Sequence, residues 1–145
     1  MTGCMNVVLA GGSAEFPEKA GWEIAARAAE EGYAVRTLLL TGEKARGGYA
    51  CHVRIGSSTV SPVIPEGHAD LLLSDAPWEA LRQLSWLKKD GQVVTLEKAA
   101  AVRKGFPEEP YLRFLKRRVR RLTILSSLHF HDIFDILCNN PAPRE

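Results

Sequence analysis

Short apolar runs that alternate with a helix-like segment are the feature that most constrains the fold of this chain. Residues 5–10 and 34–40 are two such runs, and each is typical of a buried β-strand. The segment between them is expected to form a helix that begins at Pro17 and ends near Gly32. The apolar residues that give this segment its helical spacing are Trp22, Ile24, Ala25, Ala28 and Ala29. A strand, a helix and a strand in this order form one βαβ unit with a right-handed crossover.

The rest of the chain continues the alternation. Further strands are expected at 49–55 (with one solvated face), 70–74, 92–96 and 122–125, and helices at 77–87, 111–121 and 128–138. The sequence has no internal repeat and no linker-like tract, so residues 1–145 are expected to form one domain. We therefore predict a Rossmann-like α/β domain with three layers and a mainly parallel sheet.

Composition and cysteine spacing exclude several classes of protein. No apolar run approaches the roughly 18 residues of a membrane helix, and the N-terminus lacks the features of a signal peptide, so we expect a cytoplasmic protein. The three cysteines, Cys4, Cys51 and Cys138, are far apart in sequence. Without a Cys-x-x-Cys pair, this chain is not expected to hold an iron–sulfur cluster or a four-thiolate zinc ion by itself.

A central stretch places glycines, prolines and charged residues in a fixed order between short apolar runs. It contains Arg46-Gly47-Gly48, His52-Val53-Arg54-Ile55, Ser61-Pro62-Val63-Ile64-Pro65-Glu66-Gly67 and Ala69-Asp70, and the helix after it carries Glu79-Ala80-Leu81-Arg82. In order and spacing this resembles the gamma-type domain of the 2-oxoacid:ferredoxin oxidoreductases, which act on pyruvate, ketoisovalerate or indolepyruvate. Within that family the chain is most similar to the beta subunit of indolepyruvate ferredoxin oxidoreductase, and the resemblance covers residues 5–96.

The loop after the first strand lies where α/β folds bind phosphate groups, because glycines and a helix N-terminus present backbone N–H donors there. The resembled family has Gly-x-Gly-Gly-Gln-Gly at this position, whereas this chain has Gly11-Gly12-Ser13-Ala14-Glu15-Phe16. Phe16 is expected to fill the space that a ligand needs, and Glu15 is expected to repel a diphosphate. We expect a turn that only connects strand and helix; the alternative is a nucleotide or coenzyme A site.

The central stretch also supplies the candidate site residues. Arg46, followed by Gly47 and Gly48, is suited to hold a carboxylate or phosphate of a ligand or a neighbouring subunit; the alternative is an exposed arginine beside a turn. His52 and Arg54 share one face of a strand, where solvent exposure or local pairing is expected. Asp70 is expected to cap or pair. The predicted ligand or subunit contact surface consists of Arg46, Gly47, Gly48, His52 and Arg54.

The resemblance implies an accessory gamma-type subunit of a 2-oxoacid:ferredoxin oxidoreductase-like complex. Such a chain carries no catalytic residue, metal or redox cofactor of its own. In the family, thiamine diphosphate and iron–sulfur clusters lie on other subunits or domains, which are the partners expected here. The gamma domain is implicated in acyl transfer in coenzyme A-dependent members, and the altered loop argues against coenzyme A contact in this chain. The alternative, of a different class, is a scaffold or binding protein that keeps the fold without the enzyme.

Basic residues crowd the predicted helix at 111–121. They are Arg113, Lys116, Arg117, Arg118, Arg120 and Arg121, with Leu112, Leu115, Val119 and Leu122 between them. Three interpretations stay open: docking on an acidic partner subunit, nucleic-acid binding, or a plain solvated face. The His129-Phe130-His131-Asp132 stretch is not expected to bind metal, because histidines two apart lie on different sides of a helix.

Overall fold

The structure is a computed structural model that describes residues 5–57, 61–97, 108–128 and 135–136. The elements are β1 (Met5–Gly11), α1 (Glu15–Glu30), β2 (Ala34–Gly42), η1 (Glu43–Ala45), β3 (Gly48–Gly56), β4 (Ala69–Ser74), α2 (Pro77–Arg82), η2 (Leu84–Trp86), β5 (Leu87–Leu96), α3 (Glu109–Arg118) and β6 (Arg121–Leu125). The helix expected over 128–138 falls largely outside the described residues. In the described part of the chain, each helix is too short or too polar to span a lipid bilayer.

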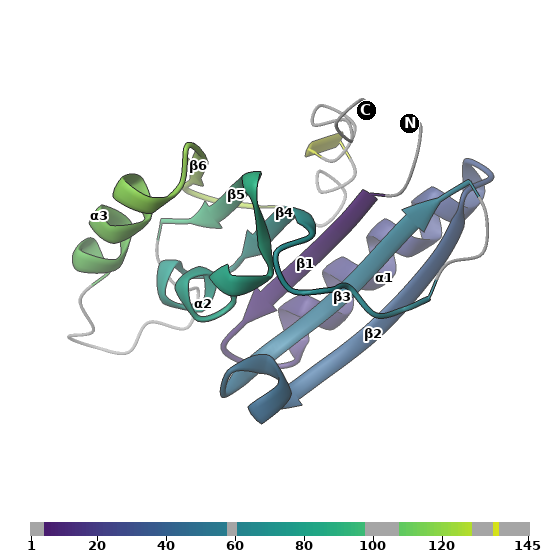
Figure 1. Ribbon diagram of the computed structural model, residues 1–145, viewed down its shortest axis with the longest axis horizontal. Coiled ribbons are helices and arrows are strands. Elements are labelled where there is room, and N and C mark those ends of the chain that lie inside the picture. Colours follow the sequence, from purple (N-terminus) through teal and green to yellow (C-terminus); the bar gives the residue numbers. More distant parts are fainter. Residues whose placement is uncertain (1–4, 58–60, 98–107, 129–134, 137–145) are drawn as a thin grey trace.

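Six strands form one sheet in the order β2-β3-β1-β4-β5-β6 (Figure 1). The strands β1, β4, β5 and β6 pair in parallel, and β3 runs antiparallel to both of its neighbours. The strand–helix–strand unit expected at the N-terminus is present, but β3 lies between β1 and β2. This insertion follows from the short η1 turn, because a turn of a few residues can join only antiparallel neighbours. The expected α/β fold with a mainly parallel sheet is confirmed.

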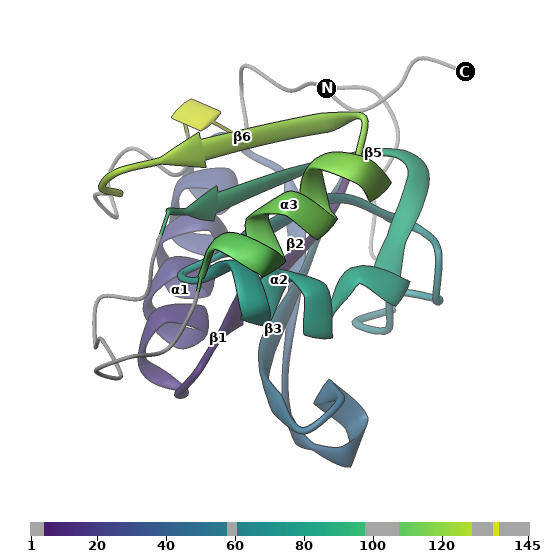
Figure 2. The same ribbon diagram turned by 90° about the vertical axis from the view of Figure 1, so that its left-hand side faces the viewer.

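The sheet is the middle layer of three, with α1 on one face and α2 and α3 on the other (Figures 1 and 2). On the first face, α1 buries Ala20, Ile24 and Ala28 against a core that includes Val7, Leu9 and Val53. Gly21 permits this close approach, because a Cβ there would lie 2.6 Å from the Sγ atom of Cys51. Trp22 does not join the core as its spacing suggested; its side chain is 69% exposed.

The second core lies between the other face of the sheet and the two short helices. It contains Val8, Leu72 and Val93 from the sheet, with Ala80 of α2 and Leu115 of α3. The strand expected to have one solvated face, β3, is instead largely buried on both faces. The second face of β3 is buried because residues 61–67 cross in front of it (Figure 1), and Ile64 of that segment is fully buried.

Two helices end earlier than their sequence patterns suggested. The helix expected to reach residue 87 ends at Arg82, because the buried side chain of Gln83 bonds to the backbone oxygen of Ala45, 2.6 Å away. The basic helix ends at Arg118. The chain then becomes extended because Arg121 pairs with Gln92 as the first residue of β6.

Candidate functional site

The loops that follow β1 and β2 meet at one edge of the sheet. Because β3 is antiparallel to β1, Tyr49 lies opposite Gly11, and Gly48 lies opposite Gly42 at the end of β2. The Arg46–Gly48 turn therefore lies beside the glycine loop that follows β1. The carboxyl end of β4 reaches the same edge. Ligands of open α/β sheets bind outside the carboxyl ends of the strands, so this edge is the natural place for a site.

The backbone of the Arg46–Gly48 turn explains its two glycines. Arg46 adopts a left-handed conformation with φ of 54°, and Gly47 has φ of 87°, a region that residues with a side chain rarely adopt. Gly48 is restricted by space, since a Cβ there would lie 2.6 Å from Cδ of Arg82 and 3.1 Å from Oε1 of Glu79. The turn is therefore built to pack against α2.

Side chains of α2 hold this turn in place. Arg82 donates through Nε to the buried carboxylate of Glu79 at 2.9 Å, and through Nη1 to the backbone oxygen of Arg46 at 3.2 Å. Gln83 fixes the preceding residue through its bond to Ala45. Glu79, Arg82 and Gln83 were not among the predicted site residues. The available signal was the Glu79-Ala80-Leu81-Arg82 part of the motif, which indicated only the family resemblance.

Arg46 is half exposed, and its guanidinium has partners within the chain. It forms an ion pair with Glu66, lies 3.3–3.4 Å from the Ser85 hydroxyl, and stacks over the Trp86 ring at 5.4 Å. The side chain thus connects the turn to the 61–67 segment and to η2.

Arg54 lies toward the opposite end of β3, about 20 Å from Gly48 at the usual rise of a strand. Its guanidinium donates to Asn6 Oδ1 at 2.9 Å and to the backbone oxygens of Ser61 and Val63 at 3.1 and 2.8 Å. Arg54 therefore anchors the 61–67 segment. The structure does not bring it into one surface with the Arg46–Gly48 turn.

Asp70 lies near the same end of the sheet as Arg54 and is paired, as expected. Its carboxylate accepts the backbone N–H of Asn6 at 2.8 Å and forms an ion pair with Lys88 at 2.7 Å. These contacts tie the amino ends of β1 and β4 to β5, which is a structural role.

His52 is a core residue, so its expected exposure or local pairing is wrong. Its side chain is 1% exposed and lies edge-on to Trp86, with ring centroids 4.6 Å apart. Its Nε2 atom has no hydrogen-bond partner within the described residues. Burial lowers the pKa of His52 to about 4, so the ring is neutral near pH 7. The residue that covers His52, Trp86, is far away in sequence, which is why the strand pattern alone did not indicate burial.

The glycine loop is tightly packed on its own chain. A Cβ at Gly11 would lie 2.8 Å from Pro17 and 3.2 Å from a carboxylate oxygen of Asp75. Phe16 packs against the α1-side core. Glu15 is exposed and forms an ion pair with Lys19 at 3.1 Å, one turn along α1. The charge of Glu15 therefore faces solvent.

Negative charge at this loop comes instead from a carboxylate that the sequence analysis did not single out. Asp75 follows β4, and its pKa is raised to about 6 by burial, by the carboxylate of Glu79 and to a smaller extent by Glu108. The backbone of Gly12 acts in the other direction and favours the ionised form of this Asp75 carboxylate. A carboxylate of the chain itself thus lies against the loop that would face a phosphate, with Oδ2 of Asp75 3.2 Å from the Cβ position of Gly11. The arrangement disfavours a second anion at the loop.

Metal and thiol chemistry find little support in the described part of the chain. Across residues 5–57, 61–97, 108–128 and 135–136, no three His, Cys, Asp or Glu side chains are grouped to hold a metal ion. The His129–Asp132 stretch, Cys4 and Cys138 lie outside these residues. Cys51 is buried, and burial together with Glu18 raises its pKa to about 11, so the thiol stays protonated.

Comparison with known proteins agrees with the fold and with the central motif. A family model described as pyruvate ferredoxin/flavodoxin oxidoreductase matches residues 6–126. The indolepyruvate oxidoreductase subunit IorB of Pyrococcus horikoshii is 37% identical over 103 residues, which cover 68% of this chain and 49% of that protein. The IorB subunit of Thermococcus kodakarensis is 41% identical over 76 residues, or 52% of this chain and 36% of that protein.

A solved structure shows the same fold at low sequence identity. The keto/oxoacid ferredoxin oxidoreductase gamma subunit from Geobacter sulfurreducens has a TM-score of 0.55 and 16% identity, covering 70% of this chain and 55% of that one. The chain spans about half the length, or less, of the curated relatives it matches. The resemblance seen in the sequence is confirmed: the chain belongs to the pyruvate ferredoxin/flavodoxin oxidoreductase family.

Proposed function

We propose that this chain is an accessory, gamma-type subunit of a 2-oxoacid:ferredoxin oxidoreductase-like complex and that other subunits carry out the oxidative decarboxylation. The observation that carries the proposal is the 37–41% identity to two IorB subunits, over 103 and 76 residues, together with the family model that matches residues 6–126 and so includes the central motif. In this role the chain contributes a shaped surface. Thiamine diphosphate and iron–sulfur clusters reside on the partner subunits, and the complex works in the cytoplasm.

The contacts of the central motif support a role in shaping a surface. Arg46 and Arg54 both have partners within the chain, and Gly47 and Gly48 are required by the turn itself. These contacts hold two loops, the Arg46–Gly48 turn and the 61–67 segment, in fixed positions beside β3. Rigid loops of defined shape suit a subunit that docks against neighbours, since less conformational entropy is lost on binding.

Coenzyme A is not held through its phosphates at the Gly11–Phe16 loop in this proposal. The support is electrostatic: the carboxylates of Asp75 and Glu79 lie beside the loop, 3.2 Å from the Cβ position of Gly11 and 3.7 Å from that of Gly12. An incoming diphosphate would have to approach both carboxylates.

Co-purification at native stoichiometry tests the proposed function. The tagged chain is expressed in its native host, and the purified assembly is analysed for iron, acid-labile sulfide and thiamine diphosphate. We expect all three, together with ferredoxin reduction by a 2-oxoacid that the isolated chain does not support. Co-purifying proteins without these cofactors would favour the scaffold alternative. Turnover of an oxoacid by the isolated chain would contradict the accessory role.

A further inference from the structure

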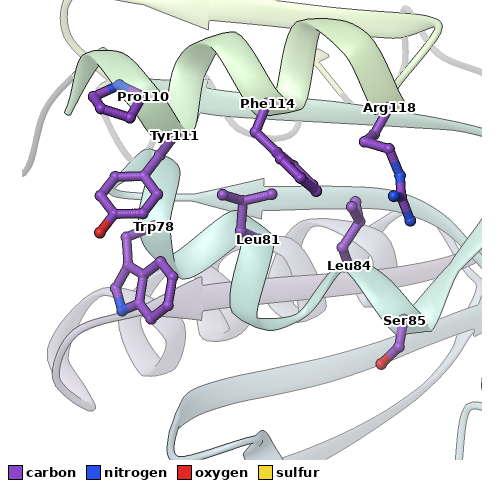
Figure 3. Close-up of a pocket in the computed structure, with 8 residues that line it drawn as sticks. All are labelled: Trp78, Leu81, Leu84, Ser85, Pro110, Tyr111, Phe114 and Arg118. Carbon is purple, nitrogen blue, oxygen red and sulfur yellow. The ribbon is translucent and has the colours of Figure 1, made fainter.

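A groove of about 630 Å³ lies between α2 and α3. Figure 3 shows side chains of the two helices facing each other across it, with Phe114 of α3 directed toward Leu81 and Leu84. At one end Trp78 and Tyr111 lie against each other with ring centroids 4.9 Å apart, and Arg118 lies at the other end.

The floor of this groove is apolar, and part of it is open to water. Trp78 is 36% exposed and Phe114 is 45% exposed, although both belong to helices whose other faces are buried. Tyr111, Phe114 and Arg118 have the spacing of one helix face. Exposed aromatic side chains on facing elements, here Trp78 and Phe114, are typical of a surface that binds a partner.

The outer surface of α3 beside the groove is strongly basic. Arg113, Lys116, Arg117 and Arg118 lie within this helix of 10 residues, which is about 15 Å long. In the part of the chain that the structure describes, none of these four forms an ion pair with a carboxylate; the guanidinium of Arg118 stacks over Phe114 at 5.3 Å. An apolar floor beside uncompensated cations is complementary to a ligand with apolar and acidic groups.

We propose that the α2–α3 groove binds an amphipathic segment of a partner subunit, whose apolar side chains enter the groove and whose flanking carboxylates meet the α3 cations. This inference rests on the proposed function, since it assigns the surface by which the accessory subunit docks. A helix that presents apolar residues at positions i, i+3 or i+4, and i+7 fits a groove between two helices. Desolvation of the aromatic residues supplies affinity, and the charges supply specificity and speed of association.

The distribution of polar groups favours a protein segment over other occupants. Small-molecule sites have several polar groups that converge on the ligand, whereas the polar groups of this groove belong to Trp78 and Tyr111 at one end and to Ser85 and Arg118 at the other (Figure 3). A nucleic acid would pair its phosphates with the cations. It would leave Leu81 and Leu84 without suitable partners, because bases bind by stacking on aromatic rings.

The test measures binding to the thiamine-diphosphate-containing subunit that co-purifies with the chain, by biolayer interferometry at several salt concentrations. We expect Phe114→Ser to weaken binding at least tenfold with the salt dependence unchanged. Arg118→Glu should weaken binding at least tenfold at low salt and reduce its salt dependence, because it inverts a rim charge. Trp22→Ser and Arg36→Glu are matched controls on other surfaces and should leave binding unchanged. Circular dichroism checks that each variant is folded.

A photo-crosslinker introduced in place of Phe114 identifies the bound segment. The proposal expects a segment with apolar residues three or four apart and adjacent Asp or Glu. Unaltered binding of both groove variants, or a crosslinked segment without acidic residues, would overturn the groove assignment and leave the proposed function standing. Salt-sensitive retention on DNA that Arg118→Glu abolishes, without an effect on subunit binding, would also overturn it. Failure to form any complex with thiamine or iron–sulfur subunits would overturn both proposals.

Discussion

Gly48 shows how a single residue fixes the relation between two motifs. The space beside it is filled by Arg82 and Glu79 of α2, so the second glycine of the turn and the Glu-x-x-Arg of the helix depend on each other. The sequence showed both motifs in the right order. Only the tertiary contact shows that they belong to one interlocked unit.

Replacing Gly48 by alanine should therefore destabilise the fold. A methyl group would lie 2.6 Å from Cδ of Arg82, and relief requires breaking the Arg82–Glu79 pair or shifting the turn. We expect a loss of about 2 kcal/mol in the free energy of unfolding, measured by urea denaturation. Gly12→Ala is the matched control, since its Cβ would lie 3.7 Å from the nearest atom and should change little.

His52 should make stability depend on pH in a defined direction. Its pKa is about 4 in the folded chain and 6.5 in the unfolded chain, so the unfolded state binds more protons between these values. Stability is fully present above pH 6.5 and is lost as pH falls toward 4, by about 2–3 kcal/mol. His52→Phe should remove this loss while keeping a ring against Trp86. Chemical denaturation at pH 7 and pH 5 measures it, with His68→Phe at an exposed position as the control.

Asp75 should make the stability of the fold depend on pH in the opposite direction to His52. Its pKa is about 6 in the folded chain and 3.8 in the unfolded chain, so the folded state binds more protons between these values. Stability therefore decreases as pH rises from about 4 to 6. Asp75→Asn should stabilise the protein at pH 7 by about 1–2 kcal/mol and have little effect at pH 4.

The same denaturation series provides the control for Asp75. Asp90 lies on an exposed part of β5 with only a distant pair to Arg120. The difference between Asp90→Asn and wild type should not change across this pH range. An Asp75→Asn variant that is less stable than wild type at pH 7 would show that the Gly12 contact outweighs the cost of burial.

At the scale of elements, the short η2 helix connects the candidate site to the core. Gln83, just before it, donates to the Ala45 oxygen at 2.6 Å and accepts the indole N–H of Trp86 at 3.0 Å. This buried amide fixes η1 and places Trp86 over His52 and Arg46. Periodicity predicted one helix through residue 87, because Leu84 and Leu87 continue the apolar stripe of Trp78 and Leu81. The buried hydrogen bonds of Gln83 end the helix earlier than this apolar pattern predicted.

Replacing Gln83 by leucine tests this connection. The variant keeps the volume but leaves the Ala45 oxygen and the Trp86 N–H without their partners, at a cost of about 2–3 kcal/mol. Amide hydrogen exchange should accelerate in residues 43–48, which depend on the link. Gln92→Leu, whose amide makes exposed contacts to Thr123 and Arg121, should cost less than about 0.5 kcal/mol. Equal effects of the two substitutions would contradict the role assigned to Gln83.

For the whole molecule, the sheet shows what a linear pattern can and cannot predict. Short apolar runs predicted all six strands of the sheet, because a strand that is buried between two layers needs apolar residues in its own segment. Local composition does not show that β3 lies between β1 and β2. It depends on pairing between residues about 45 positions apart, such as Val8 and His52.

For the candidate site, too, the sequence predicted some features and missed others. The order of the motifs identified the family and indicated Arg46, Gly47, Gly48 and Arg54 as site residues. It also suggested one contact surface, whereas the structure places Arg54 and the Arg46–Gly48 turn at opposite ends of β3. The sequence also predicted that Glu15 supplies the negative charge at the glycine loop, whereas the structure shows that Asp75 and Glu79 supply it. A charged residue adjacent in sequence can point to solvent, while one 60 positions away can lie beside the loop.

The sequence by itself determined the order of strands and helices, the α/β class and the family. These properties are set by local composition, by periodicity and by motif spacing, all of which are linear. The tertiary structure alone decided that His52 is buried, that the Asp75 carboxylate lies against the glycine loop, and that α2 and α3 leave an aromatic groove beside the cations of α3. Each of these is a contact between distant segments, whose free energy depends on three-dimensional packing and desolvation.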